Sequence, residues 1–199
     1  VKLSLTYVLI LCSLAFIILI QFNFVTILLG LLSMPFAFSY PLMKRYTYWP
    51  QLFLGFTFNY GLIMAWFSIK PEFSYIPIIF YLGAIFWTLA YDTIYGFQDI
   101  KDDEIIGVKS TSIKFKKNPK LLIFLCYSVF ISMQIISGIL MNFEYYYFIC
   151  VAIIAGHLLF FQTAKLNISN SNLCLKKFKS NNFLGLLIFL NILISKIYL

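Results

Sequence analysis

Runs of apolar residues, separated by short polar interruptions, fill almost the whole 199-residue chain. A helix that spans a membrane needs about 20 mainly apolar residues. Seven runs approach this length, and polar, charged or proline residues end each of them. They cover residues 3–21, 24–42, 51–69, 74–98, 121–141, 145–164 and 182–198. The pattern predicts an all-α protein, a polytopic membrane bundle of about seven transmembrane helices.

The composition agrees with this prediction and argues against other classes of protein. Apolar residues make up 62% of the chain and charged residues 11%, whereas about a quarter of the residues in a soluble domain are charged. The formal net charge of +8 would suit a nucleic-acid-binding protein. In so apolar a chain, however, lysine and arginine are expected in the loops on one side of a membrane. We therefore predict membrane lipid, and no nucleic acid, as a partner.

The positions of the basic residues support the number of spans. If the chain crosses the membrane seven times, thirteen of its fifteen basic residues fall on one side, and only Lys70 and Lys196 on the other. The positive-inside rule assigns the richer side to the cytoplasm. The thirteen are Lys2, Lys44, Arg45, Lys101, Lys109, Lys114, Lys116, Lys117, Lys120, Lys165, Lys176, Lys177 and Lys179.

The cysteines and the single histidine give no sign of a metal or redox site. No two of Cys12, Cys126, Cys150 and Cys174 are close enough in sequence for a CxxC pair, and we expect them to be small buried apolar residues. His157 lies inside an apolar run, where we expect a packed polar residue rather than a metal ligand.

Acidic residues concentrate in one short stretch. Five of the seven in the chain lie between Asp92 and Glu104, at the end of an apolar run. If the helix continues through this stretch, Asp92, Asp99 and Asp103 share one stripe, within about 40° of one another. Asp99 and Asp103 are then one helical turn apart and could hold a Mg²⁺ ion between them, with water and phosphate oxygens as its other ligands.

The remaining acids divide into two groups. Asp92 lies about 10 Å further toward the membrane along such a helix, and is expected either to hold a second metal ion or to have a separate task. An acid in a spanning segment is a functional candidate because its burial is costly. Asp102 and Glu104 fit a solvated acidic loop equally well.

Cationic and aromatic side chains complete the candidate site. Lys44, Arg45 and Lys109 fall on the same side of the membrane as the acids and could bind phosphate oxygens, although plain positive-inside charge would also explain them. Tyr95 could stabilise a cation through its ring face. Gly96 could admit a bulky ligand or could serve close helix packing.

The spacing of Asp92, Asp99 and Asp103 resembles the second aspartate motif of the UbiA-type family of intramembrane prenyltransferases, in which six and then three residues separate the acids. Three further segments resemble the 4-hydroxybenzoate branch of that family: Tyr40–Thr47, Ile106–Thr111 and Phe178–Gly185. In the last of these, we interpret Asn181 and Asn182 as a helix cap.

The resemblance implies a fold and an activity. The family has nine spanning helices around a central cavity, and this chain is similar from the third helix onward. We therefore expect residues 1–199 to form a single domain truncated at its N-terminus. The family's first motif, Asn-Asp-x-x-Asp-Arg-x-x-Asp, has no match in the sequence.

By this resemblance the protein transfers a polyprenyl group from polyprenyl diphosphate to the ring of 4-hydroxybenzoate, with Mg²⁺ as the cofactor. Asp92, Asp99 and Asp103 would be the catalytic and metal-binding residues, and Lys44, Arg45, Tyr95 and Lys109 would bind substrate. We expect the enzyme in the bacterial inner membrane, with its active-site face toward the cytoplasm.

Three alternatives stay open. The acceptor could be a naphthoate or a haem or chlorophyll precursor. The chain could be an incomplete membrane fragment without activity, because the first motif is absent. An ion transporter that uses Asp92 is less favoured, since its acids should follow a path through the bilayer, whereas here they gather at one face.

Overall fold

The computed structural model describes residues 2–197, and every regular element in this range is a helix. The all-α prediction is therefore confirmed. In chain order the elements are α1 (Lys2–Leu19), α2 (Phe24–Tyr46), α3 (Pro50–Phe58), α4 (Tyr60–Ile69), α5 (Ile76–Gly96), α6 (Ile100–Ile106), α7 (Thr111–Lys114), α8 (Pro119–Leu140), α9 (Tyr145–Gly156), the π-helix η1 (His157–Ala164) and α10 (Ser171–Ile197).

Within the described residues, six segments are long and apolar enough to cross a membrane. They are α2, the α3–α4 pair, α5, α8, the α9–η1 pair and α10. The remaining predicted span, which is the first in the chain and lies in α1, is apolar but shorter, over Leu3–Leu19. The protein is thus an integral membrane protein, and six of the seven predicted spans are confirmed by length and composition.

Helix α5 forms the centre of the bundle. It packs most extensively against α8, and also against α3 and α10, so that Leu89, Ala90 and Ile94 lie in the buried core with Tyr127 and Phe130 of α8. α1 packs along the edge of α2, and its side chains are almost all exposed. Because these exposed side chains are apolar, we expect lipid to cover them.

Asn59 interrupts the third span between α3 and α4. Its side-chain amide donates to the Gly55 carbonyl at 2.9 Å and to Thr88 Oγ1 of α5 at 2.8 Å. A polar side chain inside an apolar span is costly unless it is hydrogen-bonded. Here Asn59 is satisfied, and it ties the break in the span to the central helix.

The last helix begins earlier than the hydrophobic pattern indicated. α10 starts at Ser171 rather than near residue 182. Asn181 and Asn182 therefore lie inside the helix, and their interpretation as a helix cap is wrong. Lys177, predicted in a loop, is buried, and its ammonium donates to the Phe161 carbonyl of η1. The segment 171–181 misled the prediction because two of its polar residues, Lys177 and Asn181, are buried against neighbouring helices, although Lys176 and Lys179 are exposed.

The cysteine and histidine predictions are confirmed in part. Cys126 and Cys174 are buried and Cys150 is half-buried, but Cys12 is exposed on the peripheral α1. All four are free thiols. His157 is half-buried and packs as a polar residue, with its Nε2 atom 3.2 Å from Ser180 Oγ.

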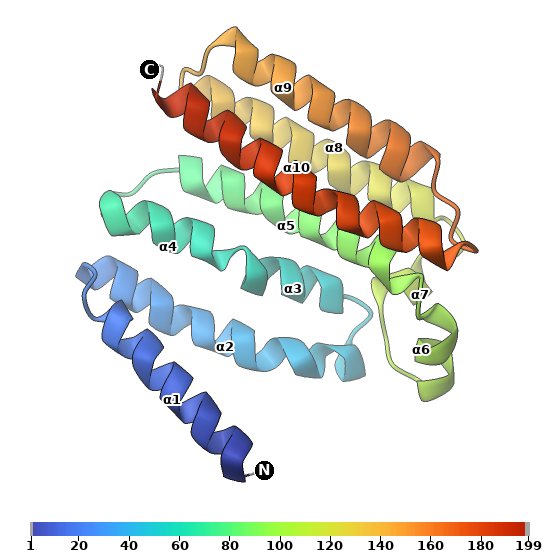
Figure 1. Ribbon diagram of the computed structural model, residues 1–199, viewed down its shortest axis with the longest axis horizontal. Helices are drawn as coiled ribbons and strands as arrows, with labels where there is room; N and C mark the ends of the chain where they lie inside the picture. Colours follow the sequence, from blue (N-terminus) through green and yellow to red (C-terminus); the bar gives the residue numbers. More distant parts are fainter. Residues whose placement is uncertain (1, 198–199) are drawn as a thin grey trace.

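The bundle has two ends of different composition (Figure 1). One carries α6 and α7, the α2–α3 turn and the turn that enters α10. The other carries the α4–α5 connection, the α8–α9 turn and the end of α10. We call the first the carboxylate end, because it holds Asp92, Asp99 and Asp103, and the second the pocket end, because of a cavity described below.

Candidate active site at the carboxylate end

The helix that carries the acidic stretch does not continue through it. α5 ends at Gly96, and Asp99 is the N-terminal flanking residue of the separate helix α6. The single stripe of Asp92, Asp99 and Asp103 along one straight helix is therefore wrong. The local part of that prediction holds, because the Asp103 N–H donates to the Asp99 carbonyl at 2.8 Å, which places these two residues one helical turn apart.

Close packing explains the break after Gly96. A Cβ atom on Gly96 would lie 2.3 Å from Ser112 Oγ, so only glycine allows α7 to approach α5 here. The next residue, Phe97, is buried in the core and holds the chain as it turns. Of the two roles considered for Gly96, the structure supports close packing of the protein against itself.

A buried set of polar side chains fixes α7 to the bundle. Ser112 Oγ donates to the Thr93 carbonyl at 2.8 Å, and the Thr93 and Thr111 hydroxyls are 2.6 Å apart. The Thr111 N–H donates to Gln51 Oε1 of α3 at 3.0 Å. All four residues are buried. We call Gln51, Thr93, Thr111 and Ser112 the polar lock, since it joins α3, α5 and α7 through satisfied hydrogen bonds.

A left-handed glycine brings the other end of this loop back to α2. Gly107 has φ 78° and closes α6, where the Asp103 carbonyl accepts from the Gly107 and Val108 N–H groups. The Lys109 N–H then donates to the Lys44 carbonyl at 2.8 Å, and Lys109 Nζ donates to the Tyr46 carbonyl at 3.3 Å. Two of the predicted cationic residues are thus held side by side.

The α2 helix extends further than predicted to reach this point. It runs through Pro41 to Tyr46, so Lys44 and Arg45 lie in its last turn rather than in a loop. Basic residues are favourable at the C-terminal end of a helix because of its dipole. Arg45 is exposed and has no hydrogen-bond or ion-pair partner in the part of the chain that the structure describes.

Asp92 faces this cluster from α5. Its side chain is half-buried, and Lys44 and Tyr40 of α2 lie within electrostatic range of it. Within residues 2–197, no side chain or N–H group donates a hydrogen bond to its carboxylate. A half-buried carboxylate without a direct partner in a spanning helix is costly, which makes it a functional candidate.

Tyr95 belongs to an aromatic row between α5 and α10. Its ring centroid is 4.5 Å from that of Phe178, which also contacts Tyr91 at 5.8 Å. Trp87 continues the row at 5.6 Å from Tyr91. Tyr95 is the exposed member of this row, and its role toward a cation stays a prediction.

The donor set fits a magnesium ion only if the substrate supplies further ligands. No group of three or more His, Cys, Asp or Glu side chains in the described range is arranged to hold a metal ion. Asp99 and Asp103 are exposed or half-exposed, without protein partners there, and one turn apart. Since Mg²⁺ usually takes one or two carboxylates and completes its shell with water and phosphate oxygens, this pair fits it.

The other acids of the stretch behave differently. Glu104 forms an ion pair with Lys116 in which both side chains are exposed, so it is part of a solvated surface. Asp102 is exposed and has no partner within residues 2–197. Both are solvated, as the solvated-loop alternative expected, but they lie in the helix α6 rather than in a loop.

Sequence reasoning missed a second polar network beside the aromatic row. Asn181 Oδ1 accepts from Trp87 Nε1 at 2.9 Å and from Gln162 Nε2 at 3.1 Å. The Tyr127 hydroxyl donates to Gln162 Oε1. Gln162 lies in η1, and π-helical turns are frequent at functional sites. Gln162 lay inside the predicted span 145–164 and Asn181 just before the last predicted span, and their amide side chains were the one available signal of this network.

Comparison with known proteins agrees with this geometry. The sequence model of the UbiA prenyltransferase family matches residues 1–193. The chain belongs to the UbiA prenyltransferase family. Its relatives include the mitochondrial 4-hydroxybenzoate polyprenyltransferases of Aedes aegypti, 38% identical over 91% of this chain and 41% of that protein, and of Rattus norvegicus, 36% identical over 94% and 50%. The 4-hydroxybenzoate geranyltransferase 1 of Lithospermum erythrorhizon is 39% identical over 91% and 59%.

This UbiA-family chain spans about half the length of the curated relatives it matches. Its fold also matches a solved structure described as digeranylgeranylglyceryl phosphate synthase in membranes, with a TM-score of 0.76. That match covers 98% of this chain and 69% of the other, at 18% sequence identity, so it bears on the fold alone. The intramembrane helical architecture expected from the resemblance is confirmed, whereas the central cavity and the domain boundaries stay predictions.

Proposed function

We propose that this chain carries the diphosphate-binding side of a prenyltransferase that moves a polyprenyl group to the ring of 4-hydroxybenzoate. The observation that carries the proposal is the meeting of three acids with two lysines at one end of the bundle. Asp92, Asp99 and Asp103 come from α5 and α6, and Lys44 and Lys109 are hydrogen-bonded through their backbones. The names of the relatives support the choice of acceptor.

In this proposal the acidic residues bind the metal ion and the basic residues bind the diphosphate. Asp99 and Asp103 would hold Mg²⁺, whose chemistry here is to neutralise the negative charge of the diphosphate. Lys44, Arg45 and Lys109 would share that charge as direct cationic contacts. Asp92, half-buried and facing Lys44, would orient the groups around the diphosphate or help to hold a second ion.

The proposed reaction is a substitution on an aromatic ring. The allylic C–O bond breaks, and the diphosphate leaves with the electron pair. A ring carbon beside the hydroxyl of 4-hydroxybenzoate attacks the cation-like carbon, and the ring then loses a proton. The exposed face of Tyr95 would stabilise the developing cation. Placing this step in the apolar bundle excludes water, which would capture the cation.

The test is prenyl transfer by membranes that contain this chain, with Mg²⁺, a polyprenyl diphosphate and 4-hydroxybenzoate. We expect activity that is lost in Asp99→Ala/Asp103→Ala. Transfer to a naphthoate but not to 4-hydroxybenzoate would mean that the acceptor is different, while the proposed prenyl-transfer reaction would stand. No transfer to any acceptor, even though the chain binds the diphosphate with Mg²⁺, would favour the incomplete-fragment alternative. Loss of both binding and transfer would contradict the proposed site.

The location of the protein is also part of the proposal. The spanning helices support a membrane protein with lipid as a partner, and the bacterial inner membrane with a cytoplasmic active site is our prediction from the charge distribution. The names of two relatives above place them in mitochondria. Fractionation of the source cells and labelling of a cysteine introduced at exposed Lys101 would test both points.

A further inference from the structure

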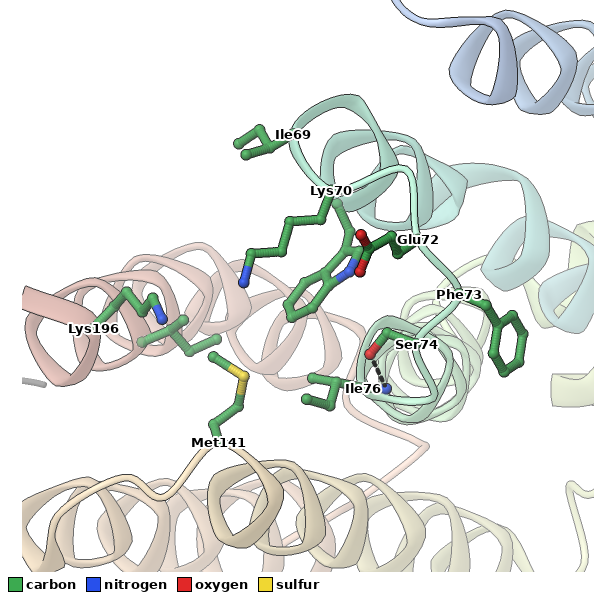
Figure 2. Close-up of a pocket in the computed structure, with 10 residues that line it drawn as sticks. Ile69, Lys70, Glu72, Phe73, Ser74, Ile76, Met141 and Lys196 are labelled. Carbon is green, nitrogen blue, oxygen red and sulfur yellow. Dashed lines mark hydrogen bonds between the residues drawn. The ribbon is translucent and has the colours of Figure 1, made fainter.

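A cavity of about 490 Å³ lies at the pocket end of the bundle, away from the candidate active site (Figure 2). Three stretches that are distant in sequence line it, and the first of them comprises both the end of α4 and the α4–α5 connection. The other two are the end of α8 and the last turns of α10. The proposed function leaves this cavity without a role.

Two lysine side chains face each other across the cavity. Figure 2 shows the amino groups of Lys70 and Lys196 directed toward the space between α4 and α10. They are the two basic residues that the topology assigns to this end. Neither amino group has a hydrogen-bond or ion-pair partner within residues 2–197. With Glu72 on the same wall, the cavity carries a net charge of +1, which matches one phosphodiester.

A third donor lies in the lining. Trp66 contributes to the cavity, and its Nε1–H is buried without a hydrogen-bond partner in the described part of the chain. Buried donors are normally satisfied, so the Trp66 N–H calls for an acceptor that the described residues do not supply. A phosphate oxygen would accept from all three groups.

The rest of the lining suits a lipid better than a free anion. Phe73, Ile76 and Met141 contribute apolar surface. Ile69, which precedes Lys70, is 81% exposed and offers apolar surface for an acyl chain beyond the cavity, whereas the 68% exposed Phe73 points away from the lysines (Figure 2). The site lies at the ends of three spanning segments, where lipid headgroups meet aromatic and lysine side chains.

We propose that this cavity binds the phosphodiester headgroup of an anionic glycerophospholipid from the leaflet at the pocket end. Lys70 and Lys196 bind the phosphate, the Trp66 N–H donates to it, and Ile69 contacts the first part of an acyl chain. The carboxylate of Glu72 limits the site to a single negative charge. The proposal does not depend on the prenyltransferase reaction.

The test uses the full chain, purified in detergent, delipidated and titrated with phosphatidylglycerol while native mass spectrometry counts the bound lipid. We expect Lys70→Gln/Lys196→Gln to bind the first lipid about tenfold more weakly or worse. The matched control Lys176→Gln/Lys179→Gln removes the same charge from exposed lysines at the other end and is expected to bind as the parent chain does. Lys70→Arg/Lys196→Arg is expected to restore binding.

Each other outcome overturns the proposal. Equal loss in both glutamine variants would mean non-specific attraction to anionic lipid, and no loss in either would assign the cavity to protein packing. Competition by inorganic phosphate or glycerol 3-phosphate at millimolar concentration would make it a site for a soluble phosphate. Thermal unfolding of each variant separates loss of binding from loss of fold, and Trp66→Phe provides a second variant that removes only the N–H donor.

Discussion

The two ends of the bundle hold charged side chains in different ways. At the carboxylate end, Lys44 and Lys109 are joined through a backbone hydrogen bond, and the polar lock fixes the adjoining loop to α3 and α5. At the pocket end, Lys70 and Lys196 project into a cavity as long side chains without a partner among residues 2–197. Groups that must meet a transition state have to be held rigidly, whereas groups that bind a mobile lipid do not. This difference agrees with our two proposals, chemistry at the first end and lipid binding at the second.

The largest effect should come from the pair of acids in α6. Asp99→Asn is expected to lower prenyl transfer by roughly 10²–10³-fold, because a lost metal ligand removes several kcal/mol of charge stabilisation. The matched control is Asp102→Asn, an exposed acid three residues away, which should leave the rate unchanged. The measurement is the rate of transfer in membranes at saturating Mg²⁺. Equal losses of transfer rate in Asp99→Asn and Asp102→Asn would contradict a specific metal-binding role for Asp99.

The polar network around Asn181, between the two ends, should matter for stability. Asn181→Leu removes the acceptor shared by Trp87 and Gln162, and should lower the free energy of unfolding by about 1–3 kcal/mol. Its neighbour Asn182 is exposed and forms no hydrogen bond within residues 2–197, so Asn182→Leu should change little. Thermal unfolding in detergent compares them, and equal melting temperatures would count against the network.

Gly96 tests whether close packing positions the loop of the carboxylate end. Gly96→Ala forces a Cβ to within 2.3 Å of Ser112 Oγ, and should cost about 1–3 kcal/mol of stability through overpacking. It should also lower transfer, because α6 moves with α7. Gly61→Ala in α4, where a Cβ meets nothing within 4 Å, is the control. A fully active, stable Gly96→Ala protein would show that the break after α5 does not depend on this contact.

Lys109 separates substrate binding from the chemical step. Lys109→Gln should raise the KM for polyprenyl diphosphate about tenfold with a smaller change in kcat, since one charge-assisted contact to phosphate is lost. Lys101→Gln removes an exposed, unpartnered lysine of the same end and is the control. If kcat fell and KM stayed constant, Lys109 would act in the transition state rather than in binding.

The smallest effect is expected from the pocket end. Lys70→Gln/Lys196→Gln should keep prenyl transfer within about twofold of the parent rate, a change of under 0.5 kcal/mol. This follows because the two lysines lie at the opposite end of the bundle from the carboxylates. A large loss of transfer in this variant would mean that the two ends are coupled, and the comparison above would fail.

Much of the fold was predictable because a bilayer allows few solutions. A spanning segment must satisfy its backbone internally, so long apolar runs become helices. Six of the seven predicted runs are long enough as observed, and the alternation of basic residues agrees with the two ends of the bundle. The resemblance to the family rested on the spacing of Asp92, Asp99 and Asp103 together with three further segments, and the family model that matches residues 1–193 confirms it.

The sequence by itself determined the membrane class, six of the seven predicted long helices and the family, and it supplied the residues that we propose for the site. Only the tertiary structure decided where the helices around that site end. α5 ends at Gly96, where Ser112 of α7 packs closely, and the first turns of α10 from Ser171 include Lys177 and Asn181, which find buried partners on η1 and α5. Hydropathy gives a polar residue the same value whether it faces water or a hydrogen-bonding partner on another helix. That choice depends on contacts between segments far apart in the chain.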